Sequence, residues 1–178
     1  MGHGGCTVEE DGEVRMFGDL KRGSMSGYWC IRRADGGGIE GSFVDGLRNG
    51  PGHETDKDGL EYLGSYHNDQ RSQTGRLCMP DGSVYVGEWK HNQKHGIGLE
   101  TVNEEDQYFG EWVSGEKHGL GYELKSGREY KGYFKNGKPH GLAVVKLPNT
   151  SKTYARFKEG ALVGFIEIAS IPSLPNVN

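Results

Sequence analysis

The sequence contains little that could form a conventional globular core. Only 33% of its 178 residues are hydrophobic, and the mean hydropathy is −0.72. No run of about 18 apolar residues offers a membrane-spanning helix, and no signal peptide is visible. A broad aliphatic core is therefore excluded, so burial must depend on the aromatic side chains, which can each bury roughly 150–250 Å².

Cysteine and catalytic motifs are equally scarce. The three cysteines, Cys6, Cys30 and Cys78, are odd in number and form no Cys-x-x-Cys pair, which argues against a disulfide framework or a structural zinc. This pattern is typical of an intracellular protein, cytoplasmic or nuclear. None of the seven histidines or 25 acidic residues lies in a nucleophile elbow, a phosphate-binding loop or an HExxH segment. We therefore expect neither enzymatic activity nor a cofactor.

Glycine, by contrast, is abundant and periodic, with 31 residues. The segment Tyr-Val-Gly-Glu-Trp at 85–89 returns as Tyr-Phe-Gly-Glu-Trp at 108–112 and as Tyr-Lys-Gly-Tyr-Phe at 130–134. Weaker copies centre on Gly18, Gly41, Gly64 and Ala155, and a half-copy lies at 3–6. A fixed period in this range indicates stacked copies of one supersecondary unit. We predict an array over 1–166, comprising a half-repeat and seven copies of about 23 residues, followed by a strand end and proline-containing tail at 167–178.

Each unit has the pattern of a β-hairpin. Alternate residues of Tyr-x-Gly-x-Trp share one strand face, and a short polar segment then turns the chain into a second, glycine-containing strand. Glycine between two aromatics leaves a gap for a neighbouring ring. The predicted fold is all-β, an elongated single-layer antiparallel array of stacked hairpins. We expect the following aromatic residues to be structural: Tyr85, Trp89, Tyr108, Trp112, Tyr130 and Phe134.

Tyr-x-Gly-x-Trp followed by Gly-Glu-Lys-His-Gly-Leu-Gly at 115–121 resembles the MORN repeat, and this resemblance implies hairpin units. Three copies depart from the pattern. Trp29 and Ala143 replace the second glycine of the hairpin, and Gln-Thr-Gly at 73–75 replaces the usual Gly-x-Gly. We expect local distortion in those copies.

Residues 35–51 and 156–160 are also similar to the MORN array that precedes the catalytic domain in certain SET-domain histone lysine methyltransferases. The catalytic Asn-His-Ser and tyrosine-bearing segments of that domain are absent. Two functions stay open on these residues. The chain is a protein-interaction and spacing scaffold, or it is the regulatory or substrate-orienting arm of a methyltransferase.

Charged residues also recur in register. The basic positions predict either a solvated edge or a docking strip for anionic lipid on a peripheral membrane protein, at about 1 kcal/mol for each cation. With a net charge of −4 and its aromatics committed to the core, the chain is not expected to bind nucleic acid. The candidate docking strip comprises Arg48, Arg71, Lys94, Lys117 and Lys138, and the acidic positions are Asp35, Asp58, Asp81 and Glu104.

Three histidines, His95, His118 and His140, share one offset in successive copies. Copies of two strands place such residues roughly 9–10 Å apart, too far to share one zinc. We therefore predict no metal site and a structural role for these side chains at the hairpin turn.

The end of the array is the last predicted feature. Residues 165–171 alternate like a strand and stop at Pro172, and Pro175 follows. An array of hairpins exposes a strand edge at each end, and such an edge can pair with another chain. We expect this strand to cover the last repeat, or to pair with a second copy or another protein.

Overall fold

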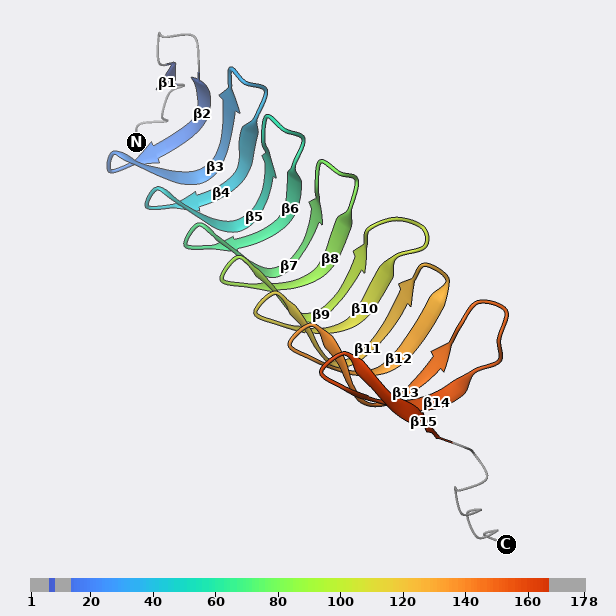
Figure 1. The fold of residues 1–178 in the computed structure, drawn as a ribbon. Helices are drawn as coiled ribbons and strands as arrows, with labels where there is room; N and C mark the ends of the chain where they lie inside the picture. Colours follow the sequence, from blue (N-terminus) through green and yellow to red (C-terminus); the bar gives the residue numbers. More distant parts are fainter. Residues whose placement is uncertain (1–6, 9–13, 167–178) are drawn as a thin grey trace, which may run out of the picture.

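The computed structural model describes residues 7–8 and 14–166 of the chain. Within them it contains fifteen strands in one sheet, which follow one another in chain order with every neighbouring pair antiparallel (Figure 1). The described residues form no helix, and thus none that could cross a membrane. This confirms the predicted all-β array of hairpins.

The strands are β1 (Thr7–Val8), β2 (Val14–Lys21), β3 (Ser24–Arg33), β4 (Gly38–Val44), β5 (Leu47–Thr55), β6 (Glu61–His67), β7 (Gln70–Cys78), β8 (Val84–Lys90), β9 (Gln93–Thr101), β10 (Gln107–Val113), β11 (Glu116–Lys125), β12 (Arg128–Lys135), β13 (Lys138–Lys146), β14 (Thr153–Lys158) and β15 (Ala161–Ile166). The half-repeat expected at 3–6 and the tail at 167–178, with most of the terminal strand, lie outside the described residues.

Two-residue turns close the hairpins at one edge of the array. Both central residues have positive φ, as in Asn68 (47°) and Asp69 (62°), or in Ser114 (50°) and Gly115 (84°). This is the type I′ geometry, whose twist matches that of the flanking strands and which favours Asn, Asp and Gly. Successive turns are also bonded to one another, because the Gly115 N–H donates to the Lys94 carbonyl at 2.9 Å. The short polar segments of the sequence therefore fix both the hairpin and its stacking.

A bulge in each second strand bends the hairpin. Gly87 pairs with Gly98, but the next residue, Glu88, pairs with His95, so two residues of β9 have no partner on β8. One of them, Gly96, has a φ of +55°, which suits glycine. Side chains four residues apart on a flat strand face stand about 13 Å apart, yet the ring centroids of Tyr85 and Trp89 are 5.2 Å apart. The strands therefore bend toward the rings, and the opposite face is convex.

Two of the three unusual copies keep this geometry, so the expected local distortion is wrong for them and is found only at Trp29. Gln73 takes the bulge position with a φ of 54°, close to the 55° of Gly96. Ala143 pairs with Gly132, and the register shifts after that pair as it does elsewhere. Trp29 pairs with Gly41 of β4, but the pairing of β2 with β3 passes from Phe17–Cys30 to Asp19–Ser26 and omits Trp29, so this copy is locally distorted as expected. At Gln73 and Ala143 the pairing on both sides overrides the local preference of a single residue.

Candidate functional site: the aromatic ladder and its cover

The concave face is filled by one continuous ladder of rings. Eight edge-to-face contacts connect them, with ring centroids 4.9–5.4 Å apart. Each internal ring touches one neighbour in its own repeat and one in the next, so the contacts continue from copy to copy. All six aromatics predicted to be structural are buried. In spatial order the ladder is Tyr66, Tyr62, Trp89, Tyr85, Trp112, Tyr108, Phe134, Tyr130 and Phe157.

The polar atoms of the ladder are bonded to the backbone. The Tyr85 hydroxyl donates to the Glu88 carbonyl at 2.9 Å, and the Trp112 indole N–H donates to the Gly98 carbonyl at 3.3 Å. Burial raises the pKa of Tyr62 and of Tyr130 to about 12, because the phenolate would lose its hydration. These tyrosines are neutral packing groups at ordinary pH, and none has the lowered pKa of an activated nucleophile.

In the first complete hairpin, the space that tyrosine fills in later copies is filled by a ring from the other strand. Met16 stands where later copies have tyrosine, and Trp29 stands where they have the second glycine. The Trp29 indole N–H donates to the Asp19 carbonyl at 3.1 Å, which is the bond that the tyrosine hydroxyl makes elsewhere. A Cβ at Gly18 would overlap the indole. One ring therefore occupies one space, reached from either strand.

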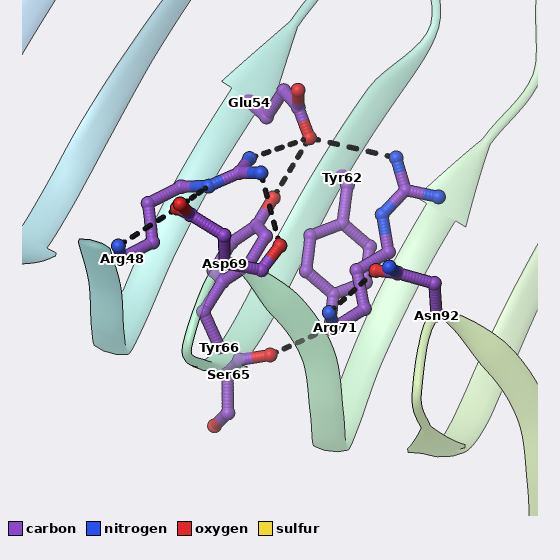
Figure 2. Close-up of polar contacts among 8 residues, drawn as sticks. All are labelled: Arg48, Glu54, Tyr62, Ser65, Tyr66, Asp69, Arg71 and Asn92. Atoms are coloured by element: carbon purple, nitrogen blue, oxygen red, sulfur yellow. Dashed lines mark hydrogen bonds and ion pairs between the residues drawn. The ribbon is translucent and has the colours of Figure 1, made fainter.

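Cations of the predicted docking strip lie over the ladder and are paired with carboxylates, as Figure 2 shows for two of them. The Arg48 guanidinium lies 4.3 Å from the Tyr66 ring centroid and 3.1 Å from the Glu54 carboxylate. Arg71 stacks 4.7 Å from the Tyr62 centroid and shares the same carboxylate at 3.5 Å. Both arginine side chains are 19% exposed. Such pairing leaves little free charge for an external anion.

Glu54 is held ionised by these neighbours. Burial opposes its charge, but the 2.9 Å hydrogen bond from the Tyr66 hydroxyl and the nearby Arg48 and Arg71 outweigh burial, so the pKa of Glu54 lies below its ordinary value. Asp69 adds a second carboxylate, 3.0 Å from Arg48 Nε. The group therefore balances two cations against two anions at ordinary pH.

The next two copies repeat the arrangement with lysine. Lys117 lies 2.6 Å from Glu123 and 4.7 Å from the Tyr108 ring centroid. Lys94 pairs with Glu100 and stands 4.9 Å from the Trp112 centroid. These distances suit cation–π contact. We call this set the ionic cover: Arg48, Arg71, Lys94, Lys117, Glu54, Glu100 and Glu123.

Lys138, the fifth residue of the predicted strip, lies off this column. It pairs with Lys135 across the hairpin and is exposed, whereas Pro139 takes the column position opposite Phe134. Strand alternation explains the difference, since adjacent residues point to opposite faces. A continuous, solvent-facing basic strip of five residues is therefore not what the structure contains.

The convex face carries an exposed apolar row that the sequence analysis did not identify. Cross-strand partners align one residue from each of nine successive strands, β6 to β14. Five of the apolar members are between 40% and 56% exposed. We call it the convex row: Leu63, Arg76, Val86, Leu99, Phe109, Tyr122, Lys131, Val144 and Tyr154. The available signal was the apolar residue that precedes Gly64, Gly87 and Gly110.

Two glutamates that repeat with the aromatics also have a role not predicted from sequence. Glu88 Oε1 accepts the Ile97 N–H at 3.0 Å, and Glu111 Oε1 accepts the Leu120 N–H at 2.9 Å. These donors lie in the bulge, where the ladder of backbone bonds is interrupted. The recurrence of Gly-Glu-Trp was the signal for this bulge cap.

The histidine column contributes to the hairpins. The carbonyl oxygen of His95 lies 3.4 Å from the Tyr85 hydroxyl, and His140 Nδ1 accepts the Glu159 N–H at 3.4 Å. The predicted acidic positions form turns, as where Asp81 Oδ1 accepts the Ser83 N–H at 2.9 Å. Over residues 7–8 and 14–166, no group of three or more His, Cys, Asp or Glu side chains could hold a metal ion.

Comparison with known proteins agrees with this architecture. The family model for the MORN repeat matches residues 40–61, 85–101, 108–125 and 130–152. No curated protein matches the chain. The matched segments carry the aromatic strands and the glycine-containing returns of four hairpins, and the structure shows the same unit before and after them. The chain is therefore a MORN-repeat protein.

Proposed function

We propose that the chain is a non-catalytic protein-interaction and spacing scaffold. The observation that carries this proposal is the convex row, in which nine successive strands place seven apolar side chains and five of these are exposed. Apolar patches that are exposed and continuous are typical of interaction sites rather than of inert surfaces. A partner that follows the array would bury them.

Spacing follows from the one-dimensional packing. Four of the eight ring contacts join neighbouring copies, and every turn is bonded to the turn before or after it in the central array. Each copy contributes two strands, so positions one copy apart are separated by roughly 10 Å. The array can therefore hold two bound molecules at a fixed distance.

The same surface would serve a free-standing protein or the arm of a methyltransferase, so the proposal covers both settings. The geometry offers less support for lipid docking, because four of the five cations of the predicted strip lie over aromatic rings and four carboxylates pair with them. The Tyr66 hydroxyl donates to Glu54 at 2.9 Å, but burial raises the pKa of Tyr66, so this pair lacks an activated nucleophile.

Photo-crosslinking in cells tests the interaction role. Benzoylphenylalanine placed at Phe109 or Val86, in the convex row, should give discrete protein adducts. The same probe at Lys90, exposed at the end of β8, should not. Phe109→Glu introduced beside the probe at Val86 should remove the adducts. Equal crosslinking from Lys90, or none from the row, would contradict the proposal.

The spacing role has its own measurement. Spin labels at Lys57→Cys and Lys125→Cys, in a chain whose native cysteines are serine, report the length of the central array. Inserting one extra copy of residues 85–107 should lengthen the label distance by about 10 Å and leave its distribution narrow. A broad distribution after insertion would show that the array is not a rigid spacer.

A further inference from the structure

The ionic cover stops before the ladder does. Phe43, Tyr66, Trp89 and Trp112 stand opposite Arg48, Arg71, Lys94 and Lys117 across their hairpins. In the next two copies the equivalent cross-strand pairs are Phe134 with Pro139 and Phe157 with Leu162. The carboxylate is lost as well, because Val145 pairs with Tyr130 where Glu123 pairs with Tyr108. Phe134 and Phe157 therefore have no cation opposite them, and Tyr130 keeps a carboxylate on one side only, from Glu123.

A groove of about 550 Å³ opens where the cover is missing. It lies on the concave face, since Tyr130, Val145 and Phe157 belong to the buried ladder and its neighbours. Two bulky residues of the last strand line its far side, and both are largely exposed: Leu162 at 48% and Phe165 at 60%. The apolar lining is Tyr130, Val145, Leu147, Phe157, Leu162 and Phe165.

The charged rim of this groove is cationic on balance. Its two carboxylates are occupied, since Glu123 pairs with Lys117 at 2.6 Å and Glu129 pairs with Lys146 at 2.9 Å. Lys125 and Arg128 also line the groove and are exposed. Neither makes an ion pair within the part of the chain that the structure describes.

We propose that this groove is a binding site for an acidic peptide segment that carries an aromatic residue. The ring would continue the ladder by edge-to-face contact with Phe157 and Phe165, at the spacing the array already uses. Carboxylates beside that ring would meet Lys125 and Arg128. The site lies on the face opposite the convex row, so it adds a second, chemically distinct surface to the scaffold.

Two other occupants fit the groove less well. A second copy placed groove to groove by a twofold axis would bring the same cationic rim against itself, and like charges facing one another disfavour such an interface. Residues 167–178 of this chain contain no aromatic side chain and one acidic side chain, Glu167. An external acidic and aromatic segment matches both the lining and the rim.

Fluorescence anisotropy with a labelled peptide of alternating Asp and Phe tests the site, and the same peptide with Lys for Asp is its control. The acidic peptide should bind, with amide shifts in nuclear magnetic resonance spectra confined to β11 to β15.

Pro139→Lys combined with Val145→Glu transplants the cover of the preceding copies and should weaken binding at least about tenfold. Leu162→Arg should block the same site from the opposite wall. Arg128→Gln should weaken binding about threefold and reduce its salt dependence.

Phe109→Glu, on the convex face, should leave peptide affinity unchanged, so this site and the scaffold surface can fail independently. Unchanged thermal midpoints show that the variants fold. Equal binding of both peptides, or full binding by both groove variants, overturns the proposal. So does self-association in ultracentrifugation that the transplanted cover removes, because the occupant is then a second copy. Amide shifts of residues 167–178 in the cover variant without peptide would also overturn it, by assigning the groove to the chain's own end.

Discussion

The central and the C-terminal copies share one ring ladder but differ in the side chains that cover its solvent side. In the centre, Lys117 and Glu123 lie over Tyr108, whereas Pro139 and Val145 take those positions beside Tyr130 and leave a groove. The order and antiparallel pairing of the strands continue through both regions, although the last hairpin skips one residue at its bulge where the central hairpins skip two. The ladder and the glycines are therefore sufficient for the fold, and the residues above the rings are free to close the surface or to open it.

Removing a central ring should have the largest effect. Trp112→Ala should lower the free energy of unfolding by about 3–5 kcal/mol, the range for truncating a buried aromatic side chain. Trp112 touches both Tyr85 and Tyr108, whereas Phe157 touches Tyr130 alone and is half-buried. Phe157→Ala should therefore cost less, about 1–2 kcal/mol. Chemical denaturation measures both, and equal losses would show that the two regions do not differ in packing.

Adding one carbon beneath a tyrosine should have the next largest effect. A Cβ at Gly110 would stand 2.6 Å from the Tyr108 hydroxyl and 2.6 Å from the Gly121 Cα, so Gly110→Ala should cost about 1–3 kcal/mol by overpacking. Gly164, in the last strand, has no atom within 4 Å of the corresponding position. Gly164→Ala is the matched control and should change stability by less than about 0.5 kcal/mol. A neutral Gly110→Ala would mean that the hydroxyl moves aside without loss.

The cover itself should contribute less. A double-mutant cycle of Lys117→Gln and Glu123→Gln should give a coupling of about 1 kcal/mol, since both side chains are about one-fifth exposed and the cation also contacts a ring. Lys138→Gln, outside the column, should have almost no effect. A coupling near zero would show that the ion pairs of the ionic cover do not contribute to stability.

The same cations decide the question of lipid docking. We expect Gln at Arg48, Arg71, Lys94 and Lys117 to lower stability without changing sedimentation with anionic liposomes, because these cations are already paired. Loss of liposome binding in a variant that remains folded would restore the lipid interpretation.

Ionisation of the buried tyrosines should have the smallest effect, because it lowers stability only at alkaline pH. Tyr62 and Tyr130 have a pKa of about 12 in the folded chain, against about 10 in an unfolded one. Because the folded value is raised, this contribution to stability is complete below pH 10 and is lost as the pH rises through about 12. Arg71 lies over Tyr62 and favours its phenolate. Arg71→Gln should therefore raise the pKa of Tyr62, followed by phenolate absorbance, and leave Tyr130 unchanged.

The fold could be predicted from sequence because the period of Gly87 and Gly110 fixes the unit, and the turn residues fix its register. The ring positions followed from the same alternation. The structure of the unusual copies could not be predicted, because Gln73 adopts a left-handed conformation only under the constraint of pairing on both sides. Local sequence alone carries no information about that constraint.

The surfaces were harder to predict than the fold. A column of Arg and Lys looks the same in sequence whether it faces solvent or folds back over rings, and the decision depends on Glu100 and Glu123, six residues further along the same strands. Lys138 was assigned to the column by counting, although a single residue of offset moves a side chain to the other face. The groove at the last copies results from the loss of a cation and a carboxylate of the ionic cover. This loss becomes visible only when the copies are superimposed in three dimensions.

The exchange of Trp29 for tyrosine constrains how such arrays evolve. A ring on the first strand and a ring at the second glycine compete for one space, so a copy with both would be overpacked, and removing the ring from Trp29 or from a tyrosine copy would leave a void. Moving the ring from one strand to the other therefore requires two substitutions whose separate effects are harmful and whose combination is tolerated. Met16 with Trp29 is such a combination, near the start of the array. Repeat copies should thus diverge in coupled pairs. A variant in which a single consensus residue is placed in an end copy should be less stable than the unchanged protein.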